Sequence, residues 1–339
     1  MAVKVAINGF GRIGRIAFRQ MINDPDFEIV ALNGIKDVEM GAHLIKYDTI
    51  LGRFEFYKEV ETTENSIIVC GKEIKVFNAR EASELPWKEV GAEIIIDCSG
   101  AYRKRDKAME HIHAGAKRVV ISAPAGNDVP TVAYGVNHEV LTSDDIIVSA
   151  ASCTTNCLAP MAKVLHQYAP IQSGIMTSVH AYTGDQKAVD GLHKKSDFRR
   201  ARAAAGNIVP NSSGAASAIG LVIPELSGKL TGSAQRVPVQ TGSSTILVAA
   251  VRGKDVTVEG INAAMKAAES PTLGYTEDEI VSSDVIGTLE GGIFDATQTM
   301  VIPMGEDLYQ VQVVAWYDNE SGYTAQMVRT IRHIANLMK

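Results

Sequence analysis

Residues 6–15 read AINGFGRIGR, in which Gly9, Gly11 and Gly14 form the spacing GxGxxG. The motif follows a short apolar run and precedes a helical spacing of apolar residues over 11–23. In this setting the first glycine permits a tight turn, the second lets the backbone approach a pyrophosphate, and the third lets helix pack on strand. The helix N-terminus adds amide donors and a positive dipole end. We therefore predict a dinucleotide site here, in preference to a purely structural glycine turn.

The first half of the chain alternates between apolar runs and helical spacing. The expected strands cover residues 3–8, 27–32, 93–98, 118–122 and 146–150, and the expected helices cover 39–47 and 105–113. A hairpin is predicted between 66 and 77, with Gly71 and Lys72 at its turn. This alternation is typical of a doubly wound parallel sheet, in which helices connect successive strands.

The second half has a different pattern. Helices are predicted over 153–168 and 323–338, and strands over 175–180, 245–251 and 308–316. Residues 183–202 form a long irregular stretch, and stretches of this kind are usually functional or disordered. The predicted fold class is therefore α/β, a doubly wound parallel sheet followed by an α+β domain with a mixed or antiparallel sheet.

Size and composition limit the possible functions. The 339 residues correspond to about two domains, with 46% hydrophobic and 21% charged residues. The net charge of -6 provides no global basic field for nucleic acid or an anionic membrane, and no apolar run approaches the ~20 residues of a membrane span. The basic residues do cluster locally, in what is either a solvated loop or a functional segment, at Lys194, Lys195, Arg199, Arg200 and Arg202. No signal peptide is visible, so we expect a cytoplasmic protein.

Four cysteines are too few for a disulfide framework in a chain of this length, and their spacing does not suit zinc. No metal site is therefore expected. Cys153 follows an apolar strand and opens a helix, where the helix N-terminus favours a thiolate. Cys157 lies one turn later and is expected to be a small buried residue. His180 ends a predicted strand and is a candidate base if the fold brings it to Cys153, although a lone histidine is often structural.

The end of the second strand departs from the usual dinucleotide pattern. An acid is expected about 20 residues after the glycine motif, where it binds the ribose hydroxyls. Gly34 occupies that place, Lys36 is basic, and Asp37 falls beyond the strand end. Without a carboxylate, nothing repels the 2′-phosphate of NADP.

Several long motifs resemble one family. The run SAASCTTNCLAPMAK at 149–163 resembles the active-site signature of phosphorylating glyceraldehyde-3-phosphate dehydrogenases. The opening AINGFGRIGR, HAYTGDQ from His180, RRARAA from Arg199 and WYDNE from Trp316 are similar to further motifs of that family. The similarity covers essentially the whole chain in order.

The resemblance implies a Rossmann domain at residues 1–152, completed by a C-terminal helix at 320–339, and a catalytic domain at 153–319. It implies a homotetramer in which the 183–202 stretch, the S-loop, lines a neighbour's cofactor site. The implied reaction converts D-glyceraldehyde 3-phosphate, inorganic phosphate and NAD or NADP to 1,3-bisphosphoglycerate, in glycolysis or its reverse. The intermediates are a hemithioacetal and then a thioester at Cys153.

The resemblance also implies the role of each site residue. Cys153 is the nucleophile and His180 the base. Asp185 is expected to orient Arg236, and Tyr317 to pack around the nicotinamide. The two phosphate sites are expected to comprise Ser152, Thr154, Thr183, Asp185, Arg200, Ser213, Gly214 and Arg236. The cofactor site is expected to comprise Gly9, Gly11, Arg12, Ile13, Gly14, Gly34, Arg80, Ser122 and Asn319.

Two departures concern the cofactor. NAD-specific members carry Asp where this chain has Gly34, and many members have proline where it has Leu192. We therefore expect acceptance of NADP as well as NAD. The rival interpretations are an erythrose-4-phosphate dehydrogenase on the same scaffold and an additional non-enzymatic binding role. The presence of Arg200 and Ser213 favours an enzyme that uses phosphate.

Overall fold

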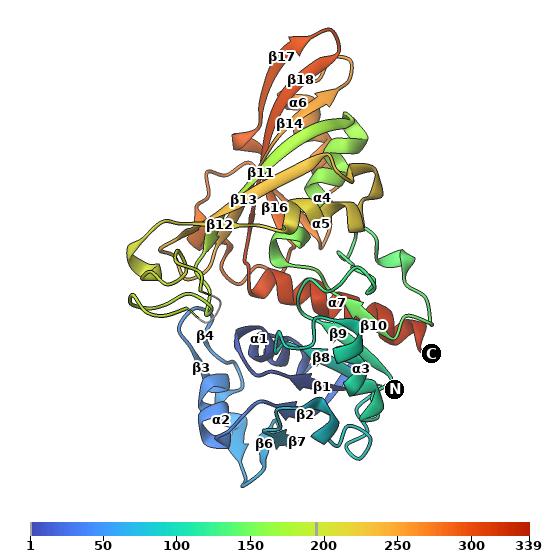
Figure 1. Ribbon diagram of the computed structural model, residues 1–339, viewed down its shortest axis with the longest axis vertical. Helices are drawn as coiled ribbons and strands as arrows, with labels where there is room; N and C mark the ends of the chain where they lie inside the picture. The colour runs from blue at the N-terminus through green and yellow to red at the C-terminus, as the bar shows by residue number, and fades with distance from the viewer. Residues whose placement is uncertain (1, 194–195) are drawn as a thin grey trace. The chain divides into compact units, whose positions relative to one another are not determined.

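The computed structural model describes residues 2–193 and 196–339 (Figure 1). Lys194 and Lys195 of the predicted basic cluster lie outside the described residues. The chain divides into two compact units. One contains the residues up to Ser152 together with Thr324–Lys339, and the other contains Cys153–Tyr323.

The first unit is built on a sheet whose central strands are parallel. Its strand order is β10-β9-β8-β1-β2-β7-β6-β5. The strands are β1 (Val3–Asn8), β2 (Phe27–Asn33), β5 (Val60–Thr62), β6 (Ser66–Val69), β7 (Lys72–Phe77), β8 (Ile94–Asp97), β9 (Arg118–Ile121) and β10 (Ile147–Ser149). A separate ribbon pairs β3 (Tyr47–Asp48) with β4 (Gly52–Arg53). Because β1 runs parallel to both β2 and β8, the carboxyl ends of these three strands lie at one edge.

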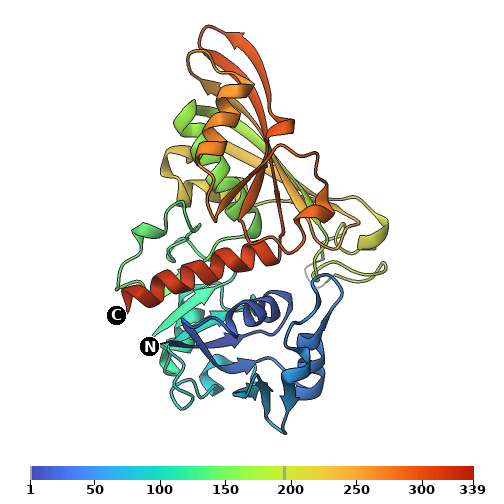
Figure 2. The same ribbon diagram turned by 180° about the vertical axis from the view of Figure 1, so that it is seen from behind.

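Both faces of this sheet are buried. Successive residues of a strand point to opposite faces, and Ile94 and Ile96 belong to one hydrophobic cluster while Ile95 belongs to the other. The helices of this unit are α1 (Arg12–Met21), α2 (Val38–Lys46), α3 (Arg105–His113) and most of α7 (Ser321–Leu337). Met327 and Ile331 place α7, red in Figure 2, in the first of these cores. A parallel sheet covered on both faces is the doubly wound arrangement.

The predicted hairpin forms, but its turn lies one residue earlier than expected. Cys70 and Gly71 both have positive φ, +51° and +74°, and Lys72 already belongs to β7. A two-residue hairpin turn that matches strand twist requires positive φ at both central positions. The prediction of Gly71 and Lys72 was therefore wrong.

The second unit is built on a largely antiparallel sheet. Its strand order is β12-β13-β11-β14-β18-β16-β15, and β17 also pairs with β18. The strands are β11 (Ile171–Ala181), β12 (Val209–Ser212), β13 (Leu230–Val237), β14 (Ser243–Arg252), β15 (Leu273–Thr276), β16 (Gly292–Asp295), β17 (Met300–Gly305) and β18 (Leu308–Tyr317). The β11–β13 pair is parallel, so the sheet is mixed.

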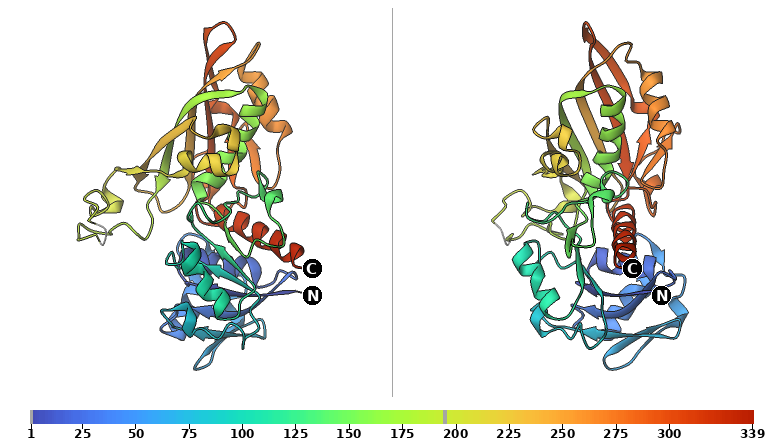
Figure 3. Two further views of the ribbon diagram at one scale, coloured as in Figure 1. Left: turned by 45° about the vertical axis from the view of Figure 1, so that its right-hand side comes forward. Right: turned by 90° about the vertical axis from the view of Figure 1, so that its right-hand side faces the viewer.

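Helices cover one face of this sheet, as Figure 3 shows for α4 (Cys153–Tyr168), α5 (Ala215–Val222) and α6 (Val258–Ala267). Alternation along β11 turns Met176, Ser178 and His180 toward the buried side, whereas Ile175 on the other face is 62% exposed. The predicted fold class, a Rossmann parallel sheet plus a domain with a mixed sheet, is confirmed. No helix among the described residues is both long and apolar enough to span a membrane.

Candidate active site

The candidate nucleophile lies at the first position of α4. Cys153 Sγ is 3.4 Å from His180 Nε2, so the fold brings together the two residues that sequence spacing could not connect. The turn before the helix contains Ala151, a buried non-glycine residue with φ +58°. Backbone conformations of this kind cost free energy and cluster at functional sites.

His180 lies near the end of β11 and is 3% exposed. Its Nδ1 is 2.7 Å from the carbonyl oxygen of Ala181, and Arg236 Nη1 lies 2.9 Å from both Nδ1 and that same oxygen. We assign the proton to Nδ1, which donates to the carbonyl at the shorter distance. Nε2 then carries the lone pair and faces Cys153 Sγ.

The protonation states follow from burial. Burial raises the pKa of the Cys153 thiol, while the positive charge of Arg236 and a hydrogen bond from Thr154 act in the opposite direction. Burial, followed by the charge of Arg236, lowers the pKa of His180 to about 3. The position of Cys153 at a helix start favours a thiolate, but burial outweighs that effect in the free chain. A neutral imidazole therefore faces a thiol whose pKa is raised.

Arg236 comes from β13, where it is in register with His180 on the parallel strand β11. Its Nη1 donates to Thr183 Oγ1 at 3.3 Å, and the buried Nε has no hydrogen-bond partner among the described residues. A guanidinium with an unused buried donor is suited to an anion.

Asp185 binds a different arginine from the one that we predicted. We expected it to orient Arg236, but its carboxylate accepts hydrogen bonds from Arg200 and from Thr183. It reaches Arg236 only through the Thr183 hydroxyl. The Arg200 guanidinium is held further by Asn211 Oδ1 at 3.0 and 3.1 Å. The sequence missed Asn211 because an isolated asparagine carries no signal of its own.

Thr154 follows Cys153 in α4. Its Oγ1 lies 3.0 Å from the hydroxyl of Tyr317, and that hydroxyl lies 2.9 Å from Ser178 Oγ. The ring of Tyr317 also meets His180 edge-on. Tyr317, predicted to be a packing residue, therefore has a polar function within the second unit, and Ser178 was not identified from the sequence.

The remaining predicted residues of this unit lie at helix and strand ends. Ser213 Oγ accepts from the amide of Ala215 at 3.3 Å, and Gly214 is the N-cap of α5. Asn319 is 4% exposed, and its Oδ1 accepts from Ser243 Oγ at 2.8 Å. Its orientation is therefore fixed, with the amide nitrogen on the other side. Ser152 directly precedes α4.

In the first unit each of the three motif positions has a different structural reason for being glycine. Gly9 has φ +96°, and a Cβ there would meet the amide nitrogen of Ser99 at 2.5 Å. A Cβ on Gly14 would meet the carbonyl oxygen of Gly9 at 2.2 Å. A Cβ on Gly11, the N-cap of α1, would meet nothing within 4 Å. Gly11 therefore leaves open space beside the helix N-terminus, where a phosphate group fits.

Residues 33–36, at the end of β2, include no carboxylate. Gly34 has φ +89° and donates its amide hydrogen to the Phe77 carbonyl at 3.0 Å. Asp37 is the N-cap of α2, and its Oδ1 accepts from the amide of Met40 at 2.9 Å. Lys36 is exposed.

The other predicted cofactor residues surround the same edge. Arg12 is paired with Asp48 of the β3–β4 ribbon, whose pKa lies below its usual value through hydrogen bonds from backbone amides and Arg12 that outweigh burial. Ile13 packs against the core. Arg80 is 95% exposed, and the amide of Ser122 donates to the Asp97 carbonyl at 2.9 Å.

A buried polar chain under this edge was missed. Asn33 Nδ2 donates to Asn8 Oδ1 at 2.7 Å, and Asn8 Nδ2 donates to Asp97 Oδ1 at 2.8 Å. Asn8 and Asn33 directly precede Gly9 and Gly34, both of which have positive φ. These hydrogen bonds therefore hold both turns in place. Polar residues ending three adjacent parallel strands were the available signal, but we considered only the glycines and the expected acid.

Comparison with known proteins agrees with this geometry. Residues 3–105 match the model of the glyceraldehyde 3-phosphate dehydrogenase NAD binding domain, and residues 152–319 match that of the C-terminal domain. The chain belongs to the glyceraldehyde-3-phosphate dehydrogenase family. The resemblance inferred from the sequence motifs is thus confirmed.

The curated relatives of this family extend over the whole chain. Glyceraldehyde-3-phosphate dehydrogenase of Clostridium pasteurianum is 55% identical over 337 residues, 99% of each chain. That of Clostridium acetobutylicum is 53% identical over the same span, and that of Streptococcus pyogenes serotype M1 is 55% identical with full coverage of both chains. Among the described residues of this family member, no three His, Cys, Asp or Glu side chains form a group that could hold a metal.

Proposed function

We propose that the chain oxidises D-glyceraldehyde 3-phosphate to 1,3-bisphosphoglycerate in glycolysis, with a nicotinamide cofactor and inorganic phosphate. The observation that supports this most directly is the contact of 3.4 Å between Cys153 Sγ and His180 Nε2 at the start of α4. A cysteine beside an unprotonated imidazole is an arrangement for covalent catalysis. As a member of its family, the chain is an NAD(P)-dependent oxidoreductase.

The first unit fits a dinucleotide. The open space at Gly11 and the amides of α1 would receive the pyrophosphate, with Arg12 and Ile13 beside them. Arg80 and Ser122 would contact the adenosine and nicotinamide-ribose parts. From the second unit, the Nδ2 of Asn319 would donate to the nicotinamide carboxamide, since its Oδ1 is already used by Ser243. The bound nicotinamide supplies the hydride acceptor.

In the acylation half-reaction Cys153 Sγ attacks the aldehyde carbon, and the thiol proton passes to the substrate oxygen to give a hemithioacetal. His180 Nε2 accepts the hydroxyl proton as the carbon loses a hydride, leaving a thioester on Cys153. The backbone N–H of Cys153 stabilises the negative charge on the substrate oxygen. The substrate phosphate would bind Arg236 and Thr183, where the Nε of Arg236 is an unused buried donor.

In the second half-reaction inorganic phosphate attacks the thioester carbon. The carbon–sulfur bond breaks, the acyl phosphate leaves, and His180 Nε2 returns its proton to the released Cys153 sulfur, which restores both residues. Thr154, Ser213, Gly214 and Arg200 would hold this phosphate, with Asp185 and Asn211 fixing the guanidinium of Arg200. Ser152 would contribute to the same region from its position before α4.

We propose that the cofactor site accepts NADP as well as NAD. Gly34 lacks a carboxylate, and the nearest one in sequence, on Asp37, uses its Oδ1 to cap α2. The side chain of Lys36 is exposed and basic, so it does not repel a 2′-phosphate.

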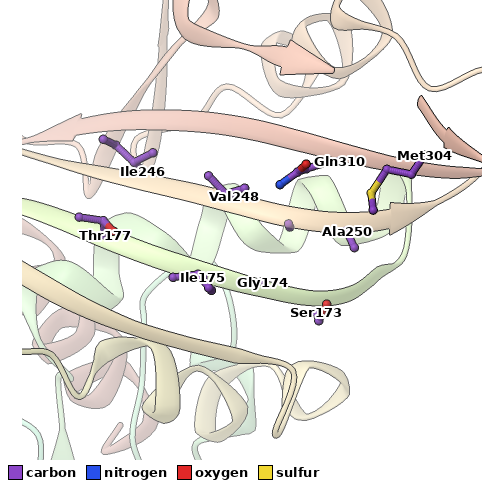
Figure 4. Close-up of a pocket in the computed structure, with 10 residues that line it drawn as sticks. Ser173, Gly174, Ile175, Thr177, Ile246, Val248, Ala250, Met304 and Gln310 are labelled. Atoms are coloured by element: carbon purple, nitrogen blue, oxygen red, sulfur yellow. The ribbon is translucent and has the colours of Figure 1, made fainter. Parts of the chain in front are cut away.

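We propose a cytoplasmic homotetramer. Apolar side chains lie on the face of the second sheet that no helix covers, and Figure 4 shows Ile175, Ile246, Val248 and Met304 around a hollow in it. Contiguous exposed apolar surface marks interaction sites. Leu192 and Phe198 of the 183–202 stretch are also exposed, by 96% and 87%, and would be covered by a neighbouring copy.

A steady-state assay tests the function and the nearest rival together. Nicotinamide reduction is measured with glyceraldehyde 3-phosphate and with erythrose 4-phosphate, each with and without inorganic phosphate. The proposal expects turnover that depends on phosphate and favours the three-carbon aldehyde. Phosphate-independent turnover that favours erythrose 4-phosphate would assign the chain to the rival activity.

A further inference from the structure

Three hydroxyl groups form a continuous row in the second unit. Ser178 Oγ lies 2.9 Å from Tyr317 Oη, which lies 3.0 Å from Thr154 Oγ1. Thr154 Oγ1 lies 4.0 Å from Cys153 Sγ, at the outer limit for a hydrogen bond to sulfur. The row therefore connects the middle of β11 to the candidate nucleophile.

The sheet brings these groups together by register and alternation. Strands β11 and β18 both pair antiparallel with β14, which lies between them. Ser178 and Tyr317 both point to the face covered by α4, where Thr154 occupies the first turn. The three residues are 0%, 1% and 6% exposed, so water does not compete for their hydrogen bonds. Buried hydrogen-bonded rows of this kind polarise one another.

The direction in which the three hydroxyl groups donate their hydrogen bonds depends on whether Cys153 is a thiol or a thiolate. A neutral thiol can donate or accept, so the hydroxyl protons can point either way. A thiolate only accepts, so Thr154 must donate toward sulfur, Tyr317 toward Thr154, and Ser178 toward Tyr317. Burial raises the pKa of Tyr317, so it remains a neutral phenol that can donate.

We propose that Ser178 is a positioning residue that stabilises the thiolate of Cys153 through Tyr317 and Thr154. Ser178 touches neither substrate nor sulfur, and it acts by supplying the last donor of the row. Without it, the Tyr317 hydroxyl donates to Thr154 but has no donor of its own, and the row is less polarised. The inference rests on the proposed role of Cys153 as the nucleophile.

The experiment follows alkylation of Cys153 by iodoacetamide as a function of pH, with the modified peptide identified by mass spectrometry. Alkylation needs no substrate or cofactor, so its outcome does not depend on the dehydrogenase assay. In Ser178→Ala we expect the pH midpoint to move upward and the rate at neutral pH to fall by about fivefold, the effect of one net hydrogen bond.

Three further variants complete the test. Ser178→Thr keeps the hydroxyl and should restore the wild-type profile, whereas Tyr317→Phe breaks the row and should move the midpoint in the same direction as Ser178→Ala. Ser173→Ala, on the uncovered face of the same strand, should change nothing. If Ser178→Ala unfolds, the Tyr317→Phe profile decides. A wild-type profile in the alanine and phenylalanine variants, or equal shifts in Ser178→Ala and Ser178→Thr, would overturn the proposal.

Discussion

Neighbouring groups have opposing effects on the pKa of the Cys153 thiol. Burial raises the pKa of the thiol, while the charge of Arg236 and the hydroxyl of Thr154 lower it. His180, with a pKa lowered to about 3, is neutral above pH 5 and contributes no positive charge. The net effect in the substrate-free chain is a raised pKa of the Cys153 thiol, which has a measurable consequence.

The alkylation rate of Cys153 is predicted to keep rising with pH beyond the midpoint of an ordinary cysteine, about 8.5. Only the thiolate reacts, and a raised pKa delays its formation to higher pH. No inflection from His180 is expected between pH 5 and 8. Stopped-flow alkylation of the wild-type chain measures this profile. A plateau already reached near pH 6 would indicate a thiolate–imidazolium pair instead.

Gly34→Asp is predicted to shift selectivity from NADP toward NAD. The new carboxylate would repel a 2′-phosphate and accept from a ribose hydroxyl. Because Gly34 has φ +89°, any side chain there also strains the backbone. Gly34→Ala carries the same strain without the charge and is the matched control.

The measurement is kcat/KM with each cofactor for the wild type and both variants. The aspartate variant should change the NAD/NADP ratio by about tenfold or more, and the alanine variant should leave the ratio near the wild-type value. A wild-type preference for NAD on the order of a thousandfold, about 4 kcal/mol, would contradict the expected acceptance of NADP.

Among the elements, α2 shows a structural role for the acid that lies beyond the end of β2. Asp37 is the nearest acid to the expected ribose position, but its Oδ1 accepts from the amide of Met40 and caps the helix. Asp37→Ala is predicted to lower the free energy of unfolding by about 1 kcal/mol. Asp37→Ser keeps a capping oxygen and should retain most of the stability. Denaturant unfolding measures both, and an altered NAD/NADP ratio in Asp37→Ala would contradict a purely capping role.

Elements with strong local patterns could be predicted from the sequence. The helices over 105–113 and 153–168 were predicted with the bounds that the structure shows. The contact between Cys153 and His180 could only be suspected, since it depends on how α4 packs on β11. Hydroxyl and amide networks, such as Ser178 with Tyr317 or Asn8 with Asp97, require register between strands distant in sequence. Asp185 was misplaced for the same reason, because its partner Arg200 lies on a loop without periodicity.

For the whole molecule, the uncovered face of the second sheet makes association testable. Ile175 is 62% exposed on that face, and Met304 beside it is 56% exposed. Ile175→Glu is predicted to reduce the assembly to smaller species, because a charge buried between copies is costly. Light scattering after size exclusion measures the mass. Ser217→Glu, an exposed position on α5, is the control, and an unchanged mass in Ile175→Glu would place the interface elsewhere.

The central claim is that Cys153 carries the acyl group between two half-reactions. The most direct measurement mixes the chain rapidly with glyceraldehyde 3-phosphate and NAD in the absence of inorganic phosphate, and follows reduced nicotinamide together with the mass of the quenched protein. We predict a burst of about one reduced nicotinamide per chain, an acyl group on the peptide that contains Cys153, and its release when phosphate is added. Cys153→Ser should bind the dinucleotide but show no burst. Continuous turnover without phosphate, or a burst that persists in Cys153→Ser, would contradict the account.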